Sequence, residues 1–517
     1  MRQNSLAIRG VIASVAAILL MCCLVRLPAK EPGQPMDSTP LPAGLMLVAP
    51  ETPIELVGSM KSLNHTLSQK LHPADNAVNL LMIVFGPNAL EPEVKRETYE
   101  LLGLKKLPDN SPLFVSLEQF TEHLDGVPAD KALERAIEIQ ADLFECGARL
   151  WSREELPQLG QYLDANAEAM TIIAAAARKP GYYAPLLSVE QPPRLLSAAL
   201  NVERRLPFLS RMFAARALLH LQENDEAQCI ADLMTCHKLA WNLAQGSPFD
   251  VSGAKAHVID SFGYRAEAAA LASGKFQGEH LVAFATAFQE QPPLPTAERA
   301  IDLGERAIVH QEIELLSTDD ESVEGFFEHS GSDSKERVDL ERLDWKQALA
   351  SADTVWDQIV QALKTRDRNE RAKQFGALDE AYQKWEQEDD TDAEEFQKLL
   401  EKDPAEAGRR VGKDMAMSLR PLWWQRQATD DRAQVRRDLI QLGLALARFR
   451  SDRKAFPATL NELAPEFLPA IPTDPHTGGP YVYSRPSESV AEVMSTGLNG
   501  QNDAGLNYND DQIIQIQ

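Results

Sequence analysis

Three side chains with acid–base chemistry, His257, Asp260 and Tyr264, follow one another at spacings of three and four residues. On a helix this spacing places all three on one face. With the nearby Glu267 they would supply the proton donor and acceptor that general acid–base catalysis needs. Such triples also arise by chance in helices, so the spacing by itself assigns no catalytic residue.

His237 lies on an apolar helical stripe that also contains Leu233, Met234 and Trp241. A histidine in such surroundings is more often a hydrogen-bonded core residue than a catalytic one. The sequence contains no glycine-rich phosphate loop, G-x-S-x-G, H-E-x-x-H or C-x-x-C pattern. We therefore expect a non-enzymatic binding or structural protein with a protein partner. The alternative is an exported hydrolase with its site in the helical domain.

A second set of residues has the chemistry of a metal site near the C-terminus. Oxygen-bearing side chains lie there in a glycine-punctuated segment, at Ser495, Asn499, Asp503, Asp510 and Asp511. Ca²⁺ takes about six to eight such oxygen ligands. The sequence predicts a Ca²⁺ site and no other cofactor. The alternative is a polar tail in which Asn507 and Asn509 close turns without an ion.

The elements that carry these residues are predicted to be mainly helical. Pro and Gly residues separate a series of helical patterns between about residues 74 and 316. The clearest is a helical hairpin, with apolar stripes from Leu206 to Leu221 and from Ile230 to Trp241 and a turn at residues 222–225. We expect a mainly α fold, an irregular helical bundle or a short αα-hairpin solenoid, plus a small α+β module at the C-terminus.

That C-terminal module begins with an amphipathic helix predicted at residues 431–449. Five prolines follow between residues 457 and 475, and then come two β-type runs at residues 481–483 and 490–494. The parts of the chain are predicted as an N-terminal membrane anchor or signal segment (1–30), a Pro-rich tether (31–55), a helical domain (56–316), an acidic linker (317–335), a charged, largely exposed helical region (336–430) and the module (431–517).

Residues 10–25 carry no charge, and Arg2, Arg9 and Arg26 flank them. The length is at the short limit for a spanning helix and the long limit for the apolar part of a signal peptide. Leu27 stands where a cleavage site has a small residue. We expect an uncleaved transmembrane signal anchor with an extracytoplasmic body. A cleaved signal peptide or lipidation of Cys22 are the alternatives.

The formal net charge of −25 argues against one class of partner, nucleic acid, because an acidic surface repels phosphate backbones. No run of Lys and Arg interleaved with aromatic residues appears along the sequence.

Three ordered blocks of the C-terminal segment resemble the head domain of the major pseudopilins of type II secretion. They are F-P-A-T-L-N-E-L at residues 456–463, P-T-D-P-H-T-G-G-P-Y-V-Y at residues 472–483 and S-T-G-L-N-G at residues 495–500. The resemblance covers about residues 431–517 and implies a pseudopilin-like fold, a Ca²⁺ site in the last loop and a bacterial periplasmic or cell-envelope location. The remainder resembles large bacterial envelope proteins to which no activity is attached.

Overall fold

The protein is mainly helical in the part of the chain that the structure describes. The computed structural model describes residues 46–47, 58–124, 128–198, 202–318, 340–365, 367–388, 393–417, 420–502 and 511–517. A three-stranded antiparallel sheet, in the order β3 (Val482–Ser487), β4 (Val490–Ser495) and β5 (Gln512–Ile516), lies at the C-terminal end. A short pairing joins β1 (Met46–Leu47) to β2 (Leu104–Lys106). The predicted mainly α class with a small strand-containing module is confirmed.

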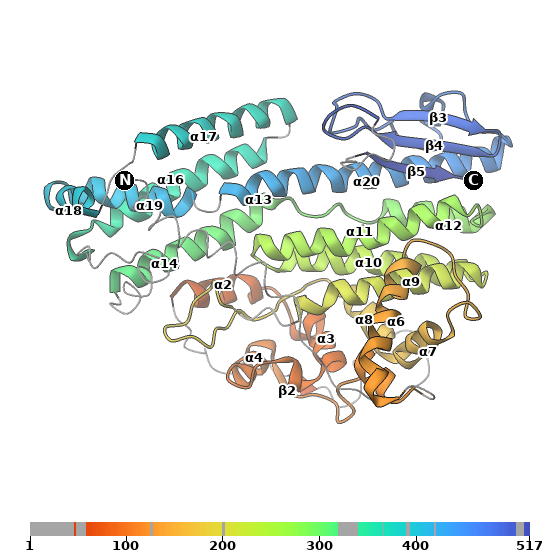
Figure 1. Ribbon diagram of the computed structural model, residues 1–517, viewed down its shortest axis with the longest axis horizontal. Helices are drawn as coiled ribbons and strands as arrows, with labels where there is room; N and C mark the ends of the chain where they lie inside the picture. The colour runs from red at the N-terminus through yellow and green to blue at the C-terminus, as the bar shows by residue number, and fades with distance from the viewer. Residues whose placement is uncertain are drawn as a thin grey trace.

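The helices before residue 290 form the larger part of the body (Figure 1). They are α2 (Gly58–Ser68), α3 (Ala77–Phe85), α4 (Lys95–Leu102), α5 (Leu117–Glu122), α6 (Ala132–Cys146), α7 (Pro157–Ala165), α8 (Ala167–Ala177), α9 (Leu206–Gln222), α10 (Glu226–Gly246), α11 (Asp250–Ala272) and α12 (Gly278–Gln289). The predicted helical hairpin is confirmed as α9 and α10. Asp225 ends its turn, because the side chain of Asp225 accepts a hydrogen bond from the backbone N–H of Gln228 and caps α10.

The remaining helices are α13 (Ala297–Ala300), α14 (Arg306–Thr318), α16 (Trp345–Lys364), α17 (Arg368–Glu388), α18 (Ala393–Lys402), α19 (Pro404–Met417) and α20 (Arg420–Arg453). A separate apolar core joins α14, α16 and α19, with Trp356 and Ile359 fully buried in it. The prediction of a largely exposed region at residues 336–430 is therefore wrong for α16. The few apolar residues of α16 are enough to form a buried face, because small residues on α19 let the two helices lie close together.

α20 follows α19 of the second core along the chain, packs into the first core and crosses the boundary predicted between residues 430 and 431. Its C-terminal half lies between α11 and α12 on one side and the sheet on the other (Figure 1). Gly443 makes this arrangement possible, because a Cβ atom there would lie 2.7 Å from Ile514 and 2.9 Å from Leu271. One core thus runs from Ala77 to Ile516, and the C-terminal module is a continuous part of the helical body.

The membrane prediction needs a correction. Within the described residues, no helix combines the length and the apolar character that crossing a bilayer requires, which contradicts the transmembrane helix and signal anchor. The segment on which that prediction fell, residues 10–25, lies outside the described residues, as do the tether except for β1 and most of the acidic linker.

Candidate functional site

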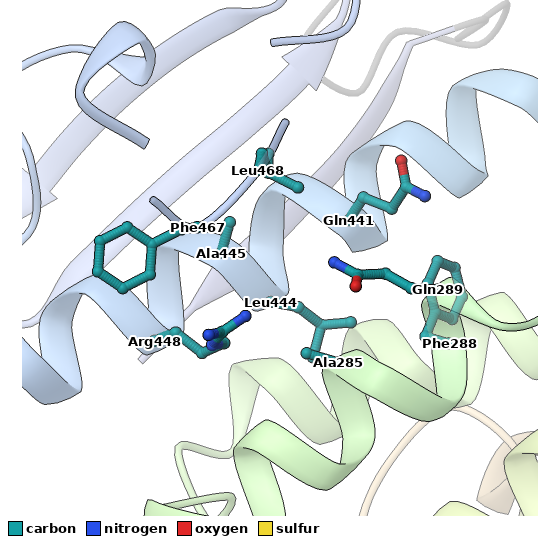
Figure 2. Close-up of a pocket in the computed structure, with 9 residues that line it drawn as sticks. All are labelled: Ala285, Phe288, Gln289, Gln441, Leu444, Ala445, Arg448, Phe467 and Leu468. Carbon is teal, nitrogen blue, oxygen red and sulfur yellow. The ribbon is translucent and has the colours of Figure 1, made fainter. Parts of the chain in front are cut away.

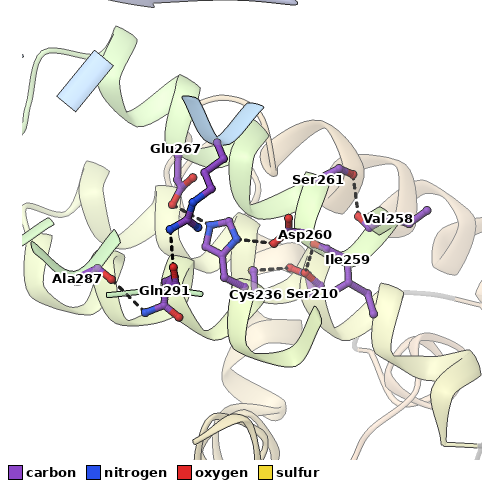
Figure 3. A network of polar contacts seen from close by, with 11 residues as sticks. Ser210, Cys236, Val258, Ile259, Asp260, Ser261, Glu267, Ala287 and Gln291 are labelled. Carbon is purple, nitrogen blue, oxygen red and sulfur yellow. Dashed lines mark hydrogen bonds and ion pairs between the residues drawn. The ribbon is translucent and has the colours of Figure 1, made fainter. Parts of the chain in front are cut away.

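A buried polar network at the junction of α10, α11 and α20 is the main concentration of acid–base groups. The imidazole of His237 lies 2.6 Å from Asp260 through Nδ1 and 2.9 Å from Glu267 through Nε2. Asp260 and Glu267 stand two turns apart on α11, and Figure 3 shows both carboxylates directed toward the space between the helices. The seven-residue spacing of Asp260 and Glu267 on α11 therefore places both carboxylates beside the imidazole of His237.

The network is closed to solvent. His237, Asp260 and Glu267 are all buried, and the ring of Tyr264 packs 4.8 Å from the imidazole. Gly263 lets α11 approach the imidazole closely, because a Cβ atom there would lie only 3.0 Å from the ring. Arg437 of α20 completes the network, with its guanidinium 5.4 Å from the ring centre of Phe288 and bonded to the carbonyl of Gln291 at 2.5 Å.

Electrostatics hold His237 in its charged form. Burial opposes protonation of the ring, but the charges of Glu267 and Asp260 and the hydrogen bonds to both outweigh burial and raise the pKa of His237 to about 10. An imidazolium donates from both ring nitrogens, so each carboxylate accepts one N–H. In this state His237 cannot act as a general base, and it joins two helices as an ion-pair bridge.

The structure separates the predicted acid–base triple. Asp260 and Tyr264 contact His237, as Glu267 does, but the Nε2 atom of His257 lies 2.9 Å from Asp430 on α20. His237 is a hydrogen-bonded core histidine, as predicted. The sequence did not reveal that Asp260 and Glu267 of the following helix are its partners. These residues meet His237 only because α10 packs against α11, and no local sequence pattern specifies that packing.

A small pocket lies close to this network, between α12 and α20 (Figure 2). Its polar lining consists of Gln289, Gln441 and Arg448, and Phe467 and Leu468 close one side. These groups can donate and accept hydrogen bonds, but the lining holds no carboxylate or histidine to exchange a proton. The pocket and the buried network therefore do not combine into an acid–base site.

The second and third C-terminal motif blocks meet at another buried carboxylate, Asp474. Its Oδ2 accepts from the hydroxyl of Ser495 at 2.8 Å, and its Oδ1 accepts from the backbone N–H of His476 at 2.8 Å. Tyr483 donates to the carbonyl of Pro457 at 2.9 Å, which joins the first block to the second. These motif residues connect the loops of the module by hydrogen bonds. This structural role explains the spacing of the blocks, and no catalytic role is needed to explain it.

Asp438 of α20 connects the second motif block to the helix. It accepts from the hydroxyl of Tyr481 at 2.8 Å and from the side chain of Gln434 at 2.7 Å. Burial raises the pKa of Asp438 to about 6, against the lowering effect of these two hydrogen bonds. Neither Asp438 nor Asp474 was identified as structural from the sequence, because nothing local distinguishes them from exposed aspartates.

The predicted Ca²⁺ ligands are only partly within the described residues. Asp503 and Asp510 lie outside them, and Asp511 directly precedes β5. Ser495 is engaged by Asp474, and the side chain of Asn499 accepts from the backbone N–H of Gln501 at 2.8 Å. Among the described residues no group of three His, Cys, Asp or Glu side chains is placed to hold a metal ion. The Ca²⁺ site stays a prediction.

No protein-family model, curated protein or solved structure matches the chain. The pseudopilin resemblance therefore depends on the sequence blocks themselves.

The charged state of His237 predicts a pH dependence of stability. The pKa in the folded protein, about 10, exceeds its ordinary value of 6.5, so protonation favours folding. The stabilising contribution is complete below about pH 6.5 and is lost as the pH rises through about 10. We expect the melting temperature to fall more steeply over this range in the natural protein than in His237→Gln. Parallel profiles would show that His237 is neutral in the fold.

Calcium is expected to stabilise the full-length protein if the C-terminal loop binds it. An ion bound only by the folded state raises the melting temperature as its concentration rises, by about 2.7 kcal/mol of stability at 100 times Kd. Asp510→Asn with Asp511→Asn should remove this shift, and Mg²⁺ serves as the control ion. The full chain is the right material, because α20 shares its core with the body. An unchanged midpoint in about 1 mM Ca²⁺ would eliminate the site at extracellular affinities.

Proposed function

We propose that the protein is a non-catalytic binding or structural component outside the cytoplasm, whose helical body presents an apolar surface to a protein partner. The observation that supports this is on α6, where Leu133, Ile137 and Phe144 are 51, 61 and 45 % exposed. Their spacing of four and seven residues places them on one side of the helix. Clustered apolar side chains at a surface are typical of protein interaction sites.

The body covers only part of the apolar surface of α6. One stripe, including Ala136, Ile139 and Leu143, is buried in the first core. The second, exposed stripe lies beside it, so burying it requires a further surface. The extracytoplasmic location depends on the apolar segment at residues 10–25 acting as an export signal.

We also propose that residues 431–517 form a pseudopilin-like head. Support comes from the contact of the second and third motif blocks at Asp474, from the contact of the first and second blocks through Tyr483, and from the packing of α20 on the sheet. The head is joined to a large helical body along α20, so we propose envelope attachment or assembly through protein contacts and no role as a secretion-filament subunit.

The exported hydrolase is the second candidate, and the convergence of His237, Asp260 and Glu267 from two helices is the observation that favours it. It is less well supported, because the three side chains are buried and both carboxylates are already bonded to His237. Substrate would reach them only if α10, α11 and α20 separated.

Photocrosslinking in the native cells tests the binding function. A photoreactive residue in place of Ile137 is expected to give a discrete crosslinked protein species, and Leu133→Ser with Phe144→Ser is expected to abolish it. Val282 on α12, which is 49 % exposed, is the matched control position. Equal crosslinking at positions 137 and 282 would mean that α6 is an ordinary surface and that the proposal is wrong.

A further inference from the structure

Two arginines, Arg211 on α9 and Arg265 on α11, lie against Phe144 of the exposed α6 stripe, and two more, Arg432 and Arg436, stand on α20. Within the described part of the chain, none of these four has a carboxylate oxygen within 4.0 Å. Other arginines nearby are paired, as Arg216 is with Asp232 at 2.7 Å and Arg149 with Glu145 at 2.7 Å. The four therefore form a local excess of positive charge in a chain of net charge −25.

Arg211 and Arg265 share the ring of Phe144, and Arg432 and Arg436 stand one turn apart on α20, so within each pair the positive charges oppose each other. Burial, and then the charge of Arg265, lowers the pKa of Arg211. Burial also lowers the pKa of Arg436, and Arg432 and Arg265 add to that effect while Asp260 opposes it. Asp260 is already bonded to His237. A bound anion would relieve this repulsion, so the free protein holds a surface that is electrostatically complementary to negative charge.

Aromatic and aliphatic side chains alternate with these cations. The guanidinium of Arg265 lies 4.7 Å from the ring centre of Phe144, and that of Arg211 lies 5.3 Å from the same ring. Arg211 also lies 4.8 Å from the ring centre of Phe262. Val258, 45 % exposed, stands one turn from Phe262 on α11. The surface can therefore contact apolar groups as well as anions.

We propose that this arginine face, made of Phe144, Arg211, Arg265, Arg432 and Arg436, binds an acidic segment of a partner protein whose Asp or Glu residues alternate with apolar ones. The proposal rests on the binding function proposed above and names the chemistry of the partner. Carboxylates pair with guanidinium groups in a forked geometry, and apolar side chains cover Phe144 and the α6 stripe. Nucleic acid fits less well, because its continuous, denser run of negative charge is repelled more strongly by the acidic remainder of the protein than a short segment with alternating apolar residues is.

The test is binding of a short fluorescent peptide of alternating Glu and Leu to the full-length protein. The peptide is expected to bind, to lose affinity as salt rises, and to bind about tenfold more weakly to Arg265→Gln with Arg432→Gln. Both substituted residues are exposed, so folding should be retained and is checked by the melting temperature. Arg96→Gln with Arg453→Gln is the matched control, because it removes equal charge from arginines paired with Glu97 and Glu466 and should leave affinity unchanged.

Three results would overturn the proposal: equal peptide affinity in the two variants, no salt dependence, or tighter binding of a single-stranded DNA oligonucleotide or phosphatidylglycerol vesicles than of the peptide. Replacing Glu by Gln throughout the peptide should abolish binding if carboxylates are what the face recognises. A crosslink at position 137 combined with no peptide binding would reject this partner chemistry and leave the binding function standing.

Discussion

Replacing His237 by leucine is expected to lower the free energy of unfolding by about 3–5 kcal/mol, because breaking a buried ion pair leaves its partner charges uncompensated. Asp260 and Glu267, two turns apart on α11, would then lose the cation that they share, and Glu267 is fully buried and has no route to water. Guanidinium denaturation followed by far-UV circular dichroism measures the loss. His123→Leu, at an exposed position, is the control and should change stability by no more than about 0.5 kcal/mol.

A double variant shows whether His237→Leu destabilises the protein by removing a positive charge or by removing packing contacts. Adding Glu267→Met to His237→Leu removes one of the stranded carboxylates and is expected to recover part of the stability. If the two substitutions instead add, so that the double variant is less stable than His237→Leu, then His237 contributes by packing and the ionic account of the network is wrong.

The second large effect is expected at Gly412, where α19 crosses α16. A Cβ atom on Gly412 would lie 1.8 Å from the carbonyl oxygen of Ala348, a backbone atom that cannot rotate away. Gly412→Ala must therefore push the two helices apart, at a cost of about 1–3 kcal/mol or more. Faster hydrogen exchange in α16, which carries the buried Trp356, would report the opening locally.

Gly376→Ala in α17 is the matched control for this prediction. Nothing lies within 4 Å of the added Cβ position, so only the helix propensity changes, and a stabilisation of about 0.5–1 kcal/mol is expected. The close approach would be refuted if both alanine variants were equally stable or if α16 exchanged at the same rate in each.

Individual helices and strands were predictable because they depend on patterns of residues close together in the sequence. The periodicity of apolar residues and the turn predicted at residues 222–225 defined α9 and α10. The β-type runs correspond to β3 and β4, whereas β5 was missed because Gln512–Ile516 follows a polar stretch of sequence and is stabilised by pairing with β4. The helix predicted at residues 431–449 is real but extends back to Arg420.

The sequence by itself determined the mainly helical class, the acidic charge and the identity of His237 as a core residue. Only the tertiary structure decided that α20 would be covered on two sides, that His237 would meet Asp260 and Glu267, and that Arg211 and Arg265 would meet at Phe144. The physical reason is the same in each case. Helix periodicity fixes which residues share a face, but the partner of that face depends on how helices distant in sequence pack.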